Sequence, residues 1–484
     1  MAQAERSRPL GCVALGDGNC RMAHRRRECC VRDQELEPLM IGAKISRWTM
    51  SYFAAALGWL LVALAMLIGG LGYPAAELGA PDTLVVVHAV CIGWLSLSVC
   101  GALFQFVPVL VARPLPFDKW ALPALFLINV GLVCLILGFL SLAGRIAPAV
   151  WLLPAGSVVL GAGLAMVALD LGLSLFSQPK GSALFVTAGL GALCATVALG
   201  AAFAFALAGS AGAFGDALLA AAIPIHAIAG LGGWLTLTAM GVSYRLLAMF
   251  MLSADLGERQ STSALKFGAL ALSVAVVGGL FAIGLGAELG AVLILAAVLG
   301  VISLALYGRD IATIYRSRKR RQLELNMRMA TVSFANLAAT VTLGTVIIVS
   351  GKVGVHVGAF AFLAVFGWLS GLIFAKLYKI VAFLTWLETY GPVMGRAPTP
   401  RVQDLAVERR SEKWFIIYFL GIWAATIMLM MGEGQAFRGA AAVMAVGSIG
   451  IIHELVRVRR LSDVAGSRRL PAGAIAPSLL FARN

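Results

Sequence analysis

The sequence predicts an all-α integral membrane protein of about twelve transmembrane helices, from its composition, the length of its apolar runs and the placement of its basic residues. Of 484 residues, 60% are hydrophobic and 13% are charged. Water could not solvate the apolar surface that would remain outside a soluble core of that composition. The apolar runs are about 20 residues or longer, which suits membrane-crossing helices, whereas membrane strands would give weaker alternating segments of about ten residues.

The apolar runs divide the chain into two tails and one transmembrane domain. Residues 1–46 form a polar N-terminal tail that we expect to be cytoplasmic and disordered, and residues 457–484 form a cytoplasmic C-terminal tail. Residues 47–456 form the transmembrane domain. Its twelve spans are placed at 47–69, 82–110, 120–143, 148–175, 183–208, 218–252, 263–286, 289–315, 330–350, 354–387, 413–431 and 437–456.

The net charge of +15 follows from membrane topology. The Lys and Arg residues gather in the tails and in alternate loops, while the opposite loops hold only Arg145, Lys352 and Arg438. Basic loops stay in the cytoplasm, so we expect a multi-pass protein of the cytoplasmic (inner) membrane with both termini cytoplasmic. The lipid bilayer, and not nucleic acid, is therefore the expected partner of this basic chain.

A recurring motif groups the spans by four. The tetrapeptide Gly-Trp-Leu-Ser/Thr occurs at 93–96, 233–236 and 367–370, in helices 2, 6 and 10. Its tryptophans are 140 (234 − 94) and 134 (368 − 234) residues apart, which corresponds to about four helices each. Helices 4, 8 and 12 end with acidic residues. This spacing predicts three pseudo-symmetric four-helix units. The acidic residues are Asp170, Asp310 and Glu454.

Three of the five histidines lie near the starts of helices 2, 6 and 10, one in each predicted unit. They are His88, His226 and His356. A buried imidazole is costly unless it is hydrogen-bonded or ligating, and ionisable residues inside a membrane are often functional. Their matching positions favour ligation over histidines that only bond a nearby carbonyl or water.

Cysteines give weaker signals. Cys91, Cys100, Cys134 and Cys194 fall inside apolar spans and are interpreted as small core residues. The N-terminal tail contains Cys12, Cys20, His24, Cys29 and Cys30, but their spacing matches no usual zinc pattern. A disordered tail is favoured over a metal site there.

With these features the sequence resembles the haem-copper oxidase subunit I superfamily, as a divergent member similar to the haem/copper nitric-oxide-response membrane proteins. The resemblance covers residues 47–456 by architecture. It implies a low-spin haem between His88, in Val-His-Ala-Val, and His356, in Val-His-Val-Gly. The haem would be a non-covalent haem b, because the chain has no Cys-x-x-Cys-His attachment motif. Two axial imidazoles suit electron transfer.

The chain also departs from the family pattern. Helix 10 of the family carries His-x-His, but this chain has Gly-Val-His at 354–356, and no histidine lies between His226 and His356. Of the copper set only His226 remains, and one imidazole needs further ligands to hold copper. The resemblance thus implies an incomplete dinuclear centre, with copper at His226 as a second candidate cofactor and no assigned catalytic residue.

The spacing of the histidines adds a further difficulty. They precede their tryptophans by 6, 8 and 12 residues. If the tryptophans are level, His356 is displaced from His88 by about 9 Å along the helices.

Two further patterns have structural alternatives. Tyr244-Arg245 and Tyr378-Lys379 follow their tryptophans by 10 and 11 residues. They are either relay pairs or interfacial aromatic and basic residues, and the second interpretation is favoured. The acidic residues that end helices 4, 8 and 12 are interpreted as members of ion pairs, because Arg309 and Arg457 flank two of them.

The sequence therefore favours a haem-binding membrane redox protein that acts in electron transfer or in haem, copper or nitric-oxide handling, with an electron-transfer partner or companion subunit. The alternatives are a secondary transporter and a cofactor-free membrane assembly subunit. Transporters usually show inverted or two-half repeats and charge near the midplane, whereas this chain shows a three-part repeat. The sequence leaves open whether the protein is an enzyme.

Overall fold

The computed structural model describes residues 48–176, 181–253 and 258–480. In these ranges the chain is helical without β-strands, and twelve helices are long and apolar enough to cross a membrane. The expected fold class is therefore confirmed. The N-terminal cysteines and His24 lie outside the described residues.

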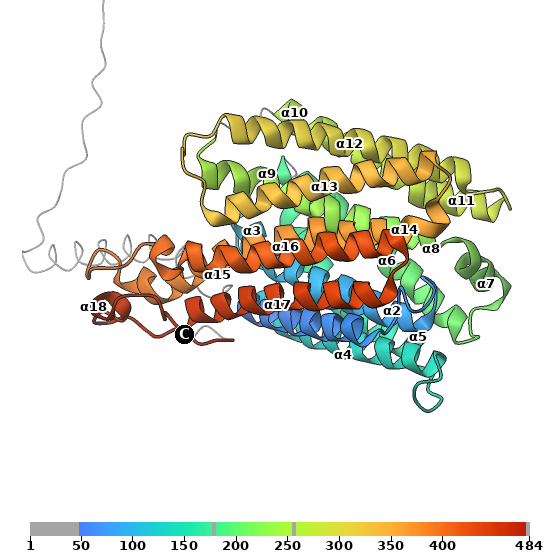
Figure 1. Cartoon of the computed structure of the whole chain (residues 1–484), viewed down its shortest axis with the longest axis horizontal. Coiled ribbons are helices and arrows are strands. Elements are labelled where there is room, and N and C mark those ends of the chain that lie inside the picture. The colour runs from blue at the N-terminus through green and yellow to red at the C-terminus, as the bar shows by residue number, and fades with distance from the viewer. Residues whose placement is uncertain (1–47, 177–180, 254–257, 481–484) are drawn as a thin grey trace, which may run out of the picture.

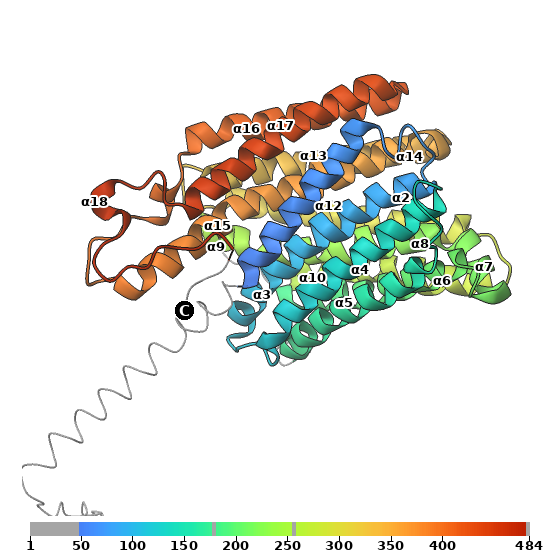
Figure 2. The same cartoon turned by 90° about the horizontal axis from the view of Figure 1, so that it is seen from below.

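The first four spans follow one another as antiparallel neighbours (Figures 1 and 2). They are the helix Trp48–Gly69; the continuous span of α2 (Pro81–His88), η1 (Ala89–Ser96) and α3 (Leu97–Val111); η2 (Asp118–Trp120) with α4 (Ala121–Leu142); and α5 (Leu152–Phe176).

The next four spans begin with α6 (Ser182–Leu207) and the short helix α7 (Gly212–Ala221). They continue with α8 (Ile223–Ala227), η3 (Ile228–Leu237) and α9 (Thr238–Met251); with α10 (Glu258–Ser273), η4 (Val274–Gly278) and α11 (Gly279–Gly284); and with α12 (Gly290–Arg316).

The last four spans begin with α13 (Leu325–Val349). They continue with α14 (Val353–Phe362), η5 (Leu363–Ser370), α15 (Gly371–Tyr390) and η6 (Gly391–Val393); with η7 (Val402–Leu405) and α16 (Glu408–Met431); and with α17 (Gly434–Arg459), which is followed by α18 (Gly466–Arg469).

The start of the sixth span differs from the expected position. Residues 218–221 end α7, and the span begins at Ile223. Pro224 lies in the first turn of α8. Because proline has no N–H and a fixed φ, it suits a helix start and separates α8 from the preceding turn.

Close helix hairpins build the outer part of the bundle. α4 packs on α5, α10 on α12 and α16 on α17, and α5 also packs on α6. Glycines permit this approach: a Cβ at Gly131 would lie 2.4 Å from the backbone nitrogen of Leu160, and one at Gly447 would lie 2.5 Å from that of Tyr418. Small residues at such crossings let membrane helices pack by van der Waals contact.

The bundle has two ends, which we name after the short helices that lie there (Figure 2). The α7 end carries the loops after the first, third, fifth, seventh, ninth and eleventh spans. The α18 end carries Trp48 and the end of α17. There, residues 460–480 fold back over the helices: the Tyr390 hydroxyl donates to the Arg469 carbonyl at 2.8 Å, and Arg459 donates to the Ser478 carbonyl.

Candidate functional site in the central spans

The second, sixth and tenth spans share an irregularity. Each changes from α-helix to π-helix at its centre, in η1, η3 and η5, and each π segment contains the Gly-Trp-Leu-Ser/Thr motif. In two of them the serine of the motif donates to the carbonyl five residues before it: Ser96 Oγ to Cys91 and Ser370 Oγ to Val365, each at 2.8 Å. π segments are rare in proteins, and those that occur often lie at functional sites.

Tryptophan–serine hydrogen bonds join these three spans at the centre of the bundle. Trp94 Nε1 donates to Ser370 Oγ at 2.8 Å, and Trp234 Nε1 donates to Ser96 Oγ at 3.0 Å. The indole nitrogen of Trp368 is buried without a hydrogen-bond partner. η1, η3 and η5 contact one another pairwise. The motifs therefore meet in one place, while the prediction of three related four-helix units stays a prediction.

His88 is the last residue of α2 and directly precedes η1. Its Nδ1 lies 2.7 Å from the Leu84 carbonyl oxygen, and its ring packs on Phe139 of α4 with 5.0 Å between the ring centres. When Nδ1–H donates to a carbonyl, the tautomer is fixed and Nε2 is free to bind a metal. His88 is therefore held through Nδ1 to its own helix, and Nε2 is the ring nitrogen left for another partner.

His226 lies in α8 and faces α6. Its ring packs edge-on against Phe203 at 5.5 Å between centres, and a Cβ at Gly200 would lie 3.1 Å from its Cε1. The buried Nδ1 has no hydrogen-bond partner.

His356 lies in the first turn of α14, and its buried Nδ1 also lacks a partner. Two residues later, a Cβ at Gly358 would lie 2.4 Å from the ring of Tyr73. The loop after the first span therefore covers this part of α14.

The hydrogen bond from Trp234 to Ser96 sets the level of the sixth span against the second. His226 precedes Trp234 by eight residues (234 − 226), and His88 precedes Ser96 by eight (96 − 88). The two histidines are therefore level, or about 3 Å apart along the helices if the tryptophans themselves are aligned.

The same comparison places His356 farther toward the α7 end. It precedes Ser370 by 14 residues (370 − 356), whereas His88 precedes Trp94 by six (94 − 88). The difference is about 12 Å along the helices, or about 9 Å with the tryptophans aligned. His88 and His356 therefore lie at different levels, and bis-histidine ligation by this pair stays a prediction that requires a shift of α14 along its axis.

Among the described residues, no three His, Cys, Asp or Glu side chains are grouped so that they could hold a metal ion. Copper at His226 stays a prediction. All four span cysteines are free thiols; Cys100 is buried and Cys91 and Cys134 are partly buried. Cys194 is exposed, so its interpretation as a core residue is wrong.

The acidic residues at the ends of the fourth, eighth and twelfth spans bind hydrogen-bond donors or basic side chains of the same protein. Asp310 pairs with Arg309 at 3.0 Å, as expected. Glu454 pairs with Arg410 of α16 at 2.7 Å, whereas Arg457, the expected partner, binds Asp463.

At the end of the fourth span, Asp170 accepts a hydrogen bond from the Phe117 backbone nitrogen at 2.8 Å, and its second carboxylate oxygen is buried without a partner. No cation pairs with Asp170 among the described residues.

The two tyrosine–base pairs are not joined to each other. The Tyr244 hydroxyl donates to Asp310 Oδ2 at 2.9 Å, and Lys379 Nζ lies 2.6 Å from Glu324 Oε2. Burial alone would raise the pKa of Glu324, but its bonds to Lys379 and Arg320 lower it. Tyr244 and Lys379 thus each bind an acidic side chain of the fold, which agrees with a structural role for them.

No protein-family model matches the chain, and no curated protein is similar to it in sequence. The fold and the central spans define it as an all-helical, polytopic membrane protein whose second, sixth and tenth spans meet through π-helical segments.

Proposed function

We propose that the protein is a haem-binding membrane redox protein of the oxidase subunit I type with an incomplete dinuclear centre. It would act in electron transfer or in haem, copper or nitric-oxide handling, in the cytoplasmic membrane. The observation that carries the proposal is His88, whose Nδ1 contact with the Leu84 carbonyl leaves Nε2 free, next to a π segment at the centre of the bundle.

The second axial ligand has two candidates. The family resemblance nominates His356, and its unpaired Nδ1 supports a role in binding. The level of the helices favours His226, which requires no shift of a helix. A bound haem would supply one-electron chemistry, and the chain would supply the axial imidazoles and a surrounding apolar core.

Visible spectroscopy of the purified full-length protein tests the proposal. We expect redox-sensitive bands of a low-spin haem b that can be extracted without breaking a covalent bond. His88→Ala should abolish the low-spin spectrum, because no other imidazole on the second span can replace it.

The other two histidines serve as each other's control. Loss of the low-spin signal in His356→Ala but not in His226→Ala would support the family assignment. The reverse result would assign the haem to the His88–His226 pair. A well-folded protein that takes up no haem would contradict the proposed function and leave the cofactor-free alternatives.

A further inference from the structure

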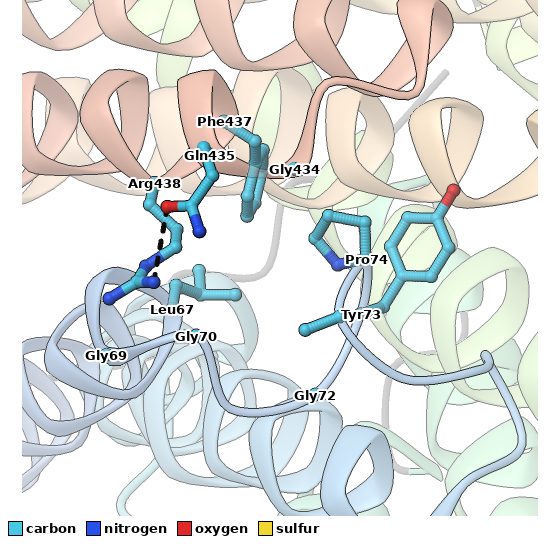
Figure 3. A pocket seen from close by; sticks show the side chains of 11 residues that line it. Leu67, Gly69, Gly70, Gly72, Tyr73, Pro74, Gly434, Gln435, Phe437 and Arg438 are labelled. Atoms are coloured by element: carbon cyan, nitrogen blue, oxygen red, sulfur yellow. Dashed lines mark hydrogen bonds between the residues drawn. The ribbon is translucent and has the colours of Figure 1, made fainter.

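A cavity of about 350 Å³ opens at the α7 end, between the end of the first span, the loop after it and the first turn of α17 (Figure 3). Its walls are apolar at Leu67, Pro74 and Phe437 and polar at Gln435 and Arg438. Small-molecule sites have this character, with apolar walls and a few polar groups, and this volume lies near the lower end of their range.

The charge of Arg438 has no counter-ion among the described residues. Its Nε donates to the Ile68 carbonyl at 2.8 Å, and Nη1 lies 3.4 Å from Gln435 Oε1. Both acceptors are neutral, and the side chain is half-buried. A guanidinium carries five N–H donors, so these contacts leave donors for an anion.

Comparison with the other bases at this end makes Arg438 distinctive. Arg145 is neutralised by Asp82 at 2.9 Å, and Lys352 is exposed. Basic residues are rare at this end of the bundle. Among the three, only Arg438 combines partial burial, no acidic partner and a position on a cavity wall.

The helix that carries Arg438 adds a second source of positive potential. α17 runs for 26 residues from Gly434, and Gly434, Gln435 and Phe437 of its first turn line the cavity. The N-terminal end of a helix dipole attracts anions, so it acts in the same direction as the guanidinium. Glu433, just before the helix, is exposed and is not part of the cavity wall.

The position of the cavity relative to the membrane indicates which kind of anion would reach it. The first span ends at Gly69 and α17 begins at Gly434, so the cavity lies where two apolar helices leave the membrane. Lipid phosphates occupy this level in a bilayer. A volume of this size holds a headgroup but not the acyl chains of a lipid.

We propose that this cavity binds the phosphate headgroup of a phospholipid from the leaflet at the α7 end. The phosphate contacts the free N–H groups of Arg438, and the glycerol carbons lie against Leu67 and Phe437. Arginine recognises phosphate by paired, charge-assisted hydrogen bonds. The site is independent of any haem.

The test measures lipid retained by the full-length protein after it is mixed with vesicles of phosphatidylglycerol or of a phosphate-free glycolipid. Wild type should retain phosphatidylglycerol selectively. Arg438→Gln should weaken retention about tenfold, the loss expected for a charge-assisted hydrogen bond. Arg145→Gln is the matched control, because it removes a base at the same end that already has a carboxylate partner, and it should leave retention unchanged.

Two further measurements complete the design. Because Arg438 also supports the Ile68 carbonyl, Leu67→Trp provides an independent variant that fills the cavity without removing charge, and it should also reduce retention. Equal retention in wild type, Arg438→Gln and Leu67→Trp would overturn the proposal. Displacement of the lipid by low concentrations of free glycerol phosphate would assign the site to a soluble phosphate and overturn its lipid origin.

Discussion

At the residue scale, two of the three motif tryptophans in the central spans donate a hydrogen bond to another span, and the third does not. Trp94 and Trp234 each reach a serine that lies two residues after the tryptophan of another span. By the same pattern Trp368 would reach Thr236, but its indole nitrogen is unpaired. A buried polar group without a partner costs free energy. Mutating the acceptor of a tryptophan that has a hydrogen bond should therefore cost more stability than mutating the residue near the unpaired Trp368.

Ser96→Ala removes the acceptor of the Trp234 indole and leaves that N–H buried without a partner. We expect a loss of about 1–3 kcal/mol in the free energy of unfolding. Thr236→Val is the matched control, because Trp368 already lacks a bond to it, and it should change stability by less than about 0.5 kcal/mol. Unfolding in detergent with increasing denaturant measures both, and equal losses would contradict the linked arrangement.

At the element scale, the spans were predictable because their existence depends on local composition. Each apolar run of about 20 residues can satisfy its backbone only as a helix within lipid, and all twelve expected runs are helices. The boundary at 218–222 was missed because apolar residues continue across it, and only Pro224 marks the break.

Tertiary partners were less predictable than the spans. The pairing of Asp310 with Arg309 involves adjacent residues and was expected from sequence. The partner of Glu454 is 44 residues away, and no local pattern identifies it. The levels of the histidines likewise depend on side-chain bonds between helices that are more than 100 residues apart.

The C-terminal segment 460–480 provides a pH prediction. Asp463 binds Arg410 and Arg457, each at 2.6 Å. The hydrogen bond from Arg410 and then that from Arg457 lower the pKa of Asp463 to about 2. Its unfolded-state pKa is about 3.9, so the stabilisation is complete above that pH and is lost as the pH falls toward about 2.

Asp463→Asn should therefore release the segment already at pH 7, and limited proteolysis should cut after Arg460 and Arg468 several-fold faster than in wild type. Acidifying wild type from pH 5 to pH 3 should act in the same direction. Asp82→Asn serves as control, because Asp82 pairs with Arg145 at the opposite end of the bundle and does not contact this segment. An unchanged cleavage rate in Asp463→Asn would contradict the anchoring role.

At the scale of the whole molecule, the charge difference between the two ends should set the orientation in the membrane. Arg145, Lys352 and Arg438 are the basic residues near the α7 end of the described chain, and one of them is neutralised by Asp82. The α18 end carries the run 316–321 and the bases that flank α16 and α17. Such a bias keeps the basic end in the cytoplasm.

Reporter fusions test this orientation. A reporter joined after Arg320 or Arg401 should be active in the cytoplasm, and one joined after Gly79 or Gly432 should be active only on the opposite side. Both sets of positions lie in loops, so the helices before each junction stay intact. Ten spans (11 − 1) separate the junctions after Gly79 and Gly432, so an odd number of true spans between them would place these two reporters on opposite sides. Inversion of all four reporters would reverse the orientation while preserving the twelve-helix map, whereas two inversions among four would contradict the map itself.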